Sequence, residues 1–224
     1  MNYLLFLYWN YDLANLSPLE FIQLLQKYHV KRVIITKKSR FGKNQQGNYK
    51  DLEKFFIVET VDLIYLIDEN QTKQKISTSY IKTQLTKGNI KLVNQALDRP
   101  FKIKGKVIYG NQMGRTLGFP TANIDYHRYY LPKNSVYIVL VYFQNKKYLG
   151  TANIGNRPTF NFSSKPSLEV YIHQFQKNIY SENLELEFYN LLRSEQKFLS
   201  ATELIQQIKT DFQNTHDFFK KICL

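Results

Sequence analysis

The 224-residue chain contains a single cysteine, Cys223, next to its last residue. One thiol can form neither an internal disulfide nor a metal centre built from cysteines, and this scarcity is typical of the reducing cytosol. The sequence has no apolar run of roughly eighteen residues, so we expect no transmembrane helix. Its first residues are apolar but lack the basic start and the small-residue cleavage site of a signal peptide. We therefore expect a cytoplasmic protein with no membrane partner.

Acidic residues are few relative to basic ones. The formal net charge is +13, from 31 Lys and Arg against 18 Asp and Glu. Such an excess attracts polyanions, and nucleic acid or a small anionic substrate such as ATP would experience the same field. The basic residues are scattered in pairs, as in Lys37-Lys38, Lys146-Lys147 and Lys220-Lys221. Because these pairs form no continuous stripe, the charge by itself does not predict a nucleic-acid partner.

Apolar material is plentiful. Hydrophobic residues make up 43% of the chain and charged residues 22%, a balance typical of a packed globular protein. A chain of this length can form one large domain or two small ones. Arg99-Pro100 is the expected boundary, because proline disfavours a helical residue before it. We therefore divide the chain into an α/β region over 1–99 and a second domain over 100–224.

The first region alternates between strand-like and helix-like segments. Ser17-Pro18-Leu19-Glu20 combines a Ser N-cap, a Pro at the first helical position and a Glu three residues after the cap, which predicts a helix start. Strands are expected over 3–8, 32–36 and 55–67, and helices over 17–28, 77–84 and 89–97. This order is typical of an α/β domain with a parallel sheet, although the region is too short for a complete doubly wound fold.

The pattern changes after Pro100. Strands are expected over 101–109, 136–143, 148–154, 168–173 and 184–189, separated by turns rich in Gly, Pro, Asn and Ser. Regular short strands of this kind favour an antiparallel barrel or sandwich. A second Ser-x-x-Glu capping box at Ser200 predicts a closing helix, whose apolar face includes Leu204, Ile208 and Phe219.

A glycine-rich segment follows the first of these strands. Gly110, Gly114 and Gly118 lie within nine residues, so backbone amides there could approach phosphate oxygens closely. The segment is not a P-loop, because the glycine spacing is one residue short, Arg115 replaces the lysine and no helical pattern follows. A plain hairpin turn explains the glycines equally well at this point.

Thr121 and Asn123 follow two positions apart. In an extended segment both side chains lie on one face and offer a hydroxyl and an amide oxygen. These hard oxygen ligands suit a magnesium ion that also binds the phosphates of ATP. The alternative is an ordinary side-chain turn after Pro120.

Three glutamates occupy strands with strict alternation. In Leu168-Glu169-Val170-Tyr171-Ile172 the apolar residues predict an inward face, and Glu169 lies on the opposite face. A carboxylate there could accept the proton of an attacking alcohol during phosphoryl transfer. Glu185 and Glu187 have similar surroundings, and any of the three could be an ordinary exposed residue. The pattern alone does not choose among them.

The ten residues Gly114-Arg115-Thr116-Leu117-Gly118-Phe119-Pro120-Thr121-Ala122-Asn123 resemble the signature of a known family. Residues 102–212 resemble the riboflavin kinase domain of the bacterial bifunctional riboflavin kinase/FMN adenylyltransferase (FAD synthetase) family. Further matching blocks follow in order at 131–132, 136–137, 153–160, 168–170, 180 and 192–198. Ser135 departs from the glycine usual there, and the residues after Glu169 also depart, which leaves the flavin contacts open.

The resemblance implies a six-stranded antiparallel barrel with a C-terminal helix, and an enzyme that uses Mg²⁺, ATP and riboflavin. It implies that Glu169 is the base that activates the riboflavin hydroxyl and that Arg193 contacts the flavin. It also implies that Thr121 and Asn123 bind the magnesium and the phosphates, with the phosphate-covering loop contributing Gly110, Gly114 and Arg115.

The first region resembles the same family's adenylyltransferase domain more weakly, at 16–21, 40–43 and 76–82. The four histidines of the chain never form that domain's His-x-Gly-His motif. We therefore expect a riboflavin kinase with weak or absent FAD synthesis. The alternatives are a bifunctional enzyme and, from another class, a basic nucleic-acid-binding barrel that would use aromatic and lysine residues near Tyr142 and Lys146.

Overall fold

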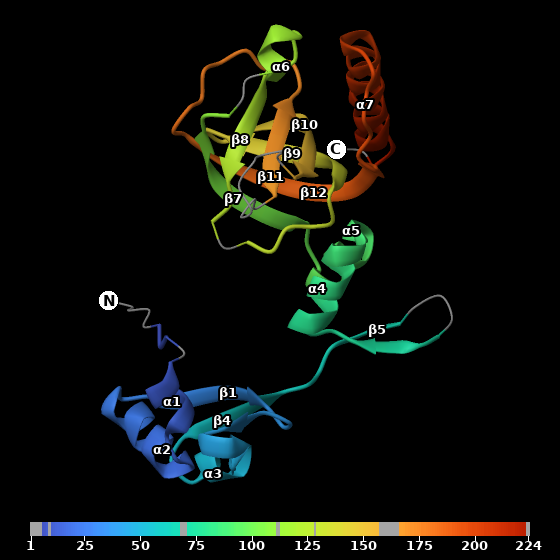
Figure 1. Ribbon diagram of the computed structural model, residues 1–224. Coiled ribbons are helices and arrows are strands. Elements are labelled where there is room, and N and C mark those ends of the chain that lie inside the picture. Colours follow the sequence, from blue (N-terminus) through green and yellow to red (C-terminus); the bar gives the residue numbers. More distant parts are fainter. Residues whose placement is uncertain are drawn as a thin grey trace. The chain divides into compact units, whose positions relative to one another are not determined.

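The computed structural model describes residues 6–8, 10–67, 71–110, 113–127, 129–156 and 166–222, without the side chains of Met113 and Arg115. Cys223 lies outside this range. The chain forms two compact units, Met1–Ile67 and Asp68–Leu224, shown in Figure 1.

The first unit is a small α/β arrangement. Strand β1 pairs in parallel with β4, as the alternating pattern predicts. The capping box forms as expected, because the Ser17 hydroxyl accepts from the Glu20 N–H and the Glu20 carboxylate accepts from the Ser17 N–H. The strand expected over 3–8 is absent at 6–8, and its remainder lies outside the described residues. The elements are α1 (Tyr11–Asn15), α2 (Pro18–Lys27), β1 (Arg32–Thr36), β2 (Arg40–Phe41), η1 (Lys43–Gln45), β3 (Gly47–Asn48), α3 (Tyr49–Glu53), β4 (Ile57–Val61) and β5 (Tyr65–Ile67).

The second unit contains a closed barrel whose six strands run in the order β10-β11-β8-β7-β12-β9, all antiparallel to their neighbours. This confirms the six-stranded antiparallel barrel. One strand, β8, had been expected only as an extended segment. The elements are β6 (Lys73–Lys75), α4 (Thr78–Lys87), α5 (Ile90–Leu97), β7 (Phe101–Ile108), α6 (Met113–Thr116), β8 (Thr121–Asp125), β9 (Ser135–Phe143), β10 (Lys146–Gly155), β11 (Ser167–Ile172), β12 (Asn183–Arg193) and α7 (Ala201–Lys221).

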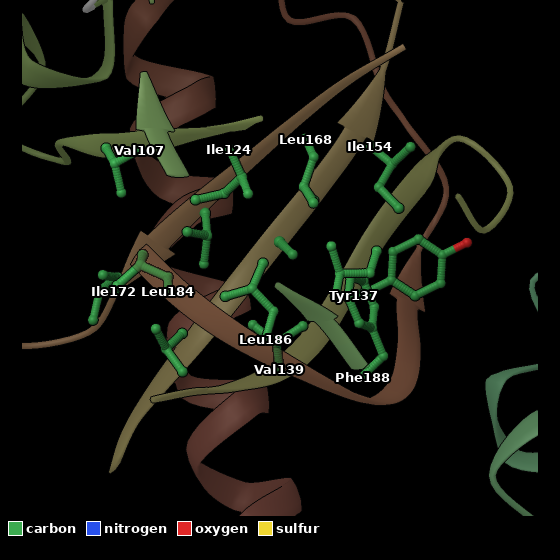
Figure 2. Packing of buried hydrophobic residues seen from close by; sticks show 14 of the residues in the cluster. Val107, Ile124, Tyr137, Val139, Ile154, Leu168, Ile172, Leu184, Leu186 and Phe188 are labelled. Carbon is green, nitrogen blue, oxygen red and sulfur yellow. The ribbon is translucent and has the colours of Figure 1, made fainter. Parts of the chain in front are cut away.

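Period-two alternation fills the barrel with apolar side chains. On β11, Leu168, Val170 and Ile172 are buried, while the residues between them are only partly covered. Figure 2 shows Leu168 and Ile172 in one apolar cluster with residues of other strands, including Leu186 and Phe188. The barrel is therefore a packed core, and its chemistry must lie at its ends or on its outer face.

Helices α4 and α5 belong to the same unit as the barrel and share its apolar core. Leu85, Ile90 and Val93 are buried in the same apolar cluster as the barrel interior. Asn94 ties the α5–β7 connection to the barrel, because its amide donates to the Phe188 carbonyl and its oxygen accepts from the Phe101 N–H, both at 2.8 Å. The compact units divide near residue 68 rather than at 99–100, because α5 packs against β7 and β12 and α4 packs against α5.

Helix α7 lies along the outside of the barrel (Figure 1) and contacts β10 and β12. Its Ser200 N-cap forms as predicted and accepts from the Glu203 N–H. Near its other end, Phe219 is 1% exposed and packs with Ile138 and Leu140 of β9. The helix is therefore attached to the barrel by an apolar cluster at its C-terminal end.

Phe219→Ala is expected to lower the free energy of unfolding by about 3–5 kcal/mol, because the cavity left by a buried aromatic ring cannot collapse fully. Urea titration followed by circular dichroism measures the loss. Leu199→Ala is the control, since Leu199 is 95% exposed and its truncation should change the stability by less than about 0.5 kcal/mol. Equal effects of the two substitutions would contradict this packing of α7.

Candidate active site

The register of the barrel places the candidate residues in one row across five strands. Asn123 on β8 pairs with Glu169 on β11, which pairs with Asn153 on β10. Asn153 in turn pairs with Val136 on β9, and Val136 pairs with Arg193 at the end of β12. Because directly paired residues share a face, the row runs over the outside of the barrel, opposite to the apolar interior.

A cavity of about 290 Å³ lies along this row. We call it the helix cavity, because α7 supplies one of its walls. Its polar residues include Thr121, Glu169 and Arg193, all predicted as site residues. The other lining residues are Gly114, Leu117, Phe119, Val136, Thr151, Asn153, Tyr171, Glu195, Gln196, Phe198, Leu204, Ile208 and Asp211. A mostly apolar wall with a few converging polar groups is the usual form of a small-molecule site.

Glu169 and Thr121 meet at one end of the helix cavity. The Thr121 hydroxyl lies 3.4 Å from Glu169 Oε2 and donates to it. Glu185 and Glu187, the other two candidates, instead bind Lys102 with Nζ–O distances of 2.8 Å. Of the three glutamates, only Glu169 lines the helix cavity.

A second cavity, of about 280 Å³, adjoins the first at Thr121. We call it the loop cavity, because residues 175–180 between β11 and β12 form one wall. Its apolar residues include Val107, Ile172 and Ile179, with Gln176 and Asn178 among the polar ones. Thr121 lines both cavities, so a group held in one lies close to a group held in the other.

Gly110 and Gly114 hold the glycine-rich segment close to β8. A Cβ atom on Gly110 would clash with the Asn123 side-chain nitrogen, and one on Gly114 would clash with the Phe119 carbonyl oxygen. The Phe119 N–H also donates to the Gly114 carbonyl at 2.8 Å. Neither position has room for a Cβ atom, which is a steric reason for glycine in addition to turn geometry. The side chain of Arg115 lies outside the described residues.

If Asn123 binds the nucleotide, as the family resemblance implies, Gly110→Ala should displace its buried side chain and raise the KM for ATP by about tenfold or more. Gly118→Ala is the comparison at an open position, because no atom lies within 4 Å of its Cβ, although its φ of 84° adds backbone strain. Steady-state kinetics with varied ATP measures both. An unchanged KM for ATP in Gly110→Ala would remove Asn123 from the nucleotide side.

Arg193 is held against helix α7. Its Nε donates to both Asp211 oxygens at 3.0 Å and its Nη2 donates to Asp211 Oδ2 at 2.8 Å. The ring of Phe198 lies 5.9 Å from the guanidinium carbon. The predicted flavin residue is thus in the cavity wall, but its position depends on a partner that the sequence did not reveal.

A histidine pair lies behind the same wall. Thr151, which lines the helix cavity, lies 2.9 Å from His173 Nε2. The His173 ring stacks on Phe212 and His216 of α7, with centroids 4.5 and 5.4 Å away. Burial, with a smaller contribution from His216, lowers the pKa of His173 to about 3. His173 is therefore neutral at physiological pH.

Sequence reasoning found part of this site. Thr121, Asn123, Glu169 and Arg193 lie in or beside one row, as a common site requires. The sequence did not identify four further residues that line the helix cavity. They are Thr151 and Asn153 on β10, Tyr171 on β11 and Asp211 on α7. The available signal for Asp211 was a polar residue within the apolar stripe of α7. Among the described residues no group of three or more His, Cys, Asp or Glu could hold a metal ion.

The six-stranded barrel brings the glycine-rich segment and the Glu169 carboxylate to one cavity, and these are elements that group-transfer chemistry uses. The riboflavin kinase family matches residues 97–219, and the FAD synthetase family matches residues 1–80. The chain therefore belongs to the riboflavin kinase/FAD synthetase family, which confirms the resemblance drawn from the Gly114–Asn123 segment.

Curated relatives agree with this assignment. The chain is 38% identical over 215 residues to the bifunctional riboflavin kinase/FMN adenylyltransferase of Listeria monocytogenes, covering 93% of this chain and 67% of the relative. It is 37% identical over 224 residues to the protein of the same name from Buchnera aphidicola subsp. Schizaphis graminum, covering 95% of this chain and 70% of the relative. The chain thus spans about two thirds of the length of these relatives.

A solved structure has a similar fold. A crystal structure described as a macrolide-efflux protein from Streptococcus pneumoniae matches with a TM-score of 0.78 and 31% identity, covering 92% of this chain and 67% of that one.

Within the part of this chain that the structure describes, no helix is both long and apolar enough to cross a membrane.

Proposed function

We propose that the protein transfers the terminal phosphate of ATP to the ribityl hydroxyl of riboflavin and releases FMN and ADP. The observation that carries this proposal is the placement of Glu169 beside Thr121, at the point where the helix cavity and the loop cavity meet. One cavity can then hold the acceptor and the other the nucleotide, with Glu169 in the wall of the helix cavity beside Thr121, which lines both cavities. Membership of the riboflavin kinase family supports these substrates.

Glu169 is the proposed general base. In the transfer, the riboflavin oxygen forms a bond to the γ-phosphorus while the bond between that phosphorus and the β,γ-bridging oxygen breaks. The proton of the hydroxyl goes to the Glu169 carboxylate, and the bridging oxygen leaves with ADP. Phosphoryl transfer needs positioning, charge neutralisation and one proton acceptor. Thr121, which donates to Glu169, also orients the carboxylate.

Thr121 and Asn123 are proposed to bind the magnesium–nucleotide complex. They suit Mg²⁺, because the hydroxyl and the amide supply the hard oxygen ligands that this ion prefers. When bound, the ion would neutralise charge on the phosphates. Gly110 and Gly114 bring their backbone close to the same strand and would cover the phosphates, together with Arg115.

The helix cavity is proposed to hold the flavin. Phe119, Phe198 and Leu204 give it the apolar surface that a planar aromatic ring system needs, and Arg193 lies in its wall as the flavin-side cation. The nucleotide base would then occupy the loop cavity, beside Ile172 and Ile179. Both substrates are small molecules available in the cytoplasm, where we place the enzyme, and the proposal needs no nucleic-acid partner.

The match of residues 1–80 to the FAD synthetase family favours one second candidate, a bifunctional enzyme. We propose kinase activity from the domain 100–224 and weak or absent FAD synthesis from the region 1–99, because the 224 residues contain no His-x-Gly-His motif.

One assay tests both proposals. The purified protein is incubated with riboflavin, ATP and Mg²⁺, and in parallel with FMN, ATP and Mg²⁺, and the flavins are separated by chromatography. We expect FMN from the first mixture and little FAD from the second. Absence of FMN would overturn the kinase proposal, and rapid FAD formation would establish the bifunctional alternative.

A further inference from the structure

We propose that Asp211 is a positioning residue of the helix cavity, which orients the Arg193 guanidinium and holds the face of α7 that closes the cavity. The inference rests on the proposed function and deepens it, because it identifies how the riboflavin side of the site is kept in shape. Asp211 is on α7 and Arg193 ends β12, so the pair joins the α7 wall of the cavity to the barrel.

The pair is well shielded from solvent and fully engaged. The side chains of Arg193 and Asp211 are only 18% and 6% exposed. Both carboxylate oxygens accept from Arg193, and Oδ1 also accepts from Gln207 Nε2 at 2.9 Å. A shielded charge pair is costly to separate, because each partner would leave the other uncompensated. Arg193 and Asp211 therefore move as one unit.

This engagement fixes what Arg193 can offer a ligand. An arginine side chain has five N–H groups in one plane. Bonds to Asp211 and to the Ser194 carbonyl use Nε–H, one N–H of Nη2 and one of Nη1. Two N–H groups remain for a ligand, and the planar geometry determines their directions. Asp211 thus determines the orientation of the Arg193 guanidinium.

The same residue belongs to the α7 face that lines the cavity. Leu204, Ile208 and Asp211 follow at spacings of four and three, which places them on one side of the helix, and all three line the cavity. The buried anchors Thr215 and Phe219 lie further toward the C-terminal end of α7. The ion pair therefore stabilises the half of the helix that faces the ligand, which Thr215 and Phe219 do not hold.

A merely structural ion pair would change stability without changing substrate preference. The positioning role makes a different prediction, because Asp211 acts on the riboflavin side of the site and the nucleotide side lies beyond Thr121. Its loss should raise the KM for riboflavin and leave the KM for ATP unchanged.

The test compares Asp211→Asn with Asp217→Asn. Asp217 is a partly exposed residue of the same helix that accepts from Gln213 four residues before it, just as Asp211 accepts from Gln207. We expect Asp211→Asn to raise the KM for riboflavin at least about tenfold, with the KM for ATP within about twofold and kcat within about threefold. Arg193→Lys, which keeps the charge but loses the two-point contact, should show the same selective rise. Asp217→Asn should match the wild type.

An unchanged KM for riboflavin in folded Asp211→Asn overturns the inference, as does an equal rise of both KM values. If circular dichroism shows that Asp211→Asn does not fold, Arg193→Lys decides by the same criteria. A wild-type protein that forms no FMN overturns the proposed function and this inference with it, whereas an active wild type with an insensitive variant overturns the inference alone.

Discussion

Glu169→Gln is expected to lower kcat for FMN formation by roughly 10²- to 10⁴-fold, the range typical of a lost general base. The amide has nearly the same shape as the carboxylate but cannot accept the proton of the riboflavin hydroxyl. Glu169 lies on the outer face of β11, and its Oε2 contacts the Thr121 hydroxyl at the junction of the two cavities. The substitution should therefore act on the chemical step and leave nucleotide binding largely intact.

The matched control is Glu185→Gln, the same change in a neighbouring alternating strand. Glu185 binds Lys102 and Lys104 at 2.8 and 2.7 Å and does not line the helix cavity. Its loss should leave kcat within about threefold of the wild type, since exposed or partly exposed ion pairs contribute little. Steady-state kinetics and ATP titration separate rate from binding. A Glu169→Gln enzyme with wild-type kcat would remove Glu169 from its proposed role.

Acidification is expected to destabilise the protein through His173, beginning near pH 6.5. His173 is 3% exposed, and burial followed by the neighbouring His216 lowers its pKa from 6.5 to about 3. Its Nδ1 is buried without a hydrogen-bond partner among the described residues. Protonation would thus add a charged N–H where no acceptor lies, against the ring of Phe212 and beside Thr151.

The direction follows from proton linkage. Below pH 6.5 the unfolded chain binds a proton at His173 that the folded chain does not, so the free energy of unfolding falls as the pH falls. Stability from the neutral histidine is fully present above pH 6.5 and is lost progressively toward the folded pKa of about 3. The slope is about 1.4 kcal/mol per pH unit, and the loss between pH 6.5 and 5 is about 2 kcal/mol.

His173→Phe should remove this slope, because phenylalanine keeps the ring in the stack but cannot be protonated. The difference in unfolding free energy between wild type and variant should change by about 2 kcal/mol between pH 6.5 and 5. His127→Asn serves as the control, since the His127 side chain is 67% exposed and asparagine tolerates its φ of 51°. Urea titrations at several pH values provide the measurement. Parallel pH profiles for wild type and His173→Phe would contradict the account.

The local patterns of the sequence determine much of this fold. Alternation on β11 predicts that Leu168 and Val170 face inward and Glu169 outward, and the structure confirms it. The capping boxes at Ser17 and Ser200 locate two helix starts correctly, because the signal lies within four residues. Such features depend on neighbours in the chain and can be predicted without a structure.

The row that forms the site could not be predicted in this way. Its members Asn123, Glu169, Asn153 and Arg193 come from four strands, and the register that aligns them is set when the barrel closes. Strand β8 was missed as a strand because it is only five residues long and begins directly after Pro120. Asp211 was missed because its partner is eighteen residues away on another element. These are long-range properties, and the family resemblance supplied some of them where residue patterns could not.

The transfer of the terminal phosphate itself tests the central claim most directly. The purified protein is given riboflavin, Mg²⁺ and ATP labelled with ³²P in the γ-phosphate, and the label is followed into the separated flavins. The account predicts labelled FMN in amounts equal to the ADP formed, with the transfer lost when Mg²⁺ is removed. The absence of label from FMN, or its release only as inorganic phosphate, would contradict the proposed phosphate transfer.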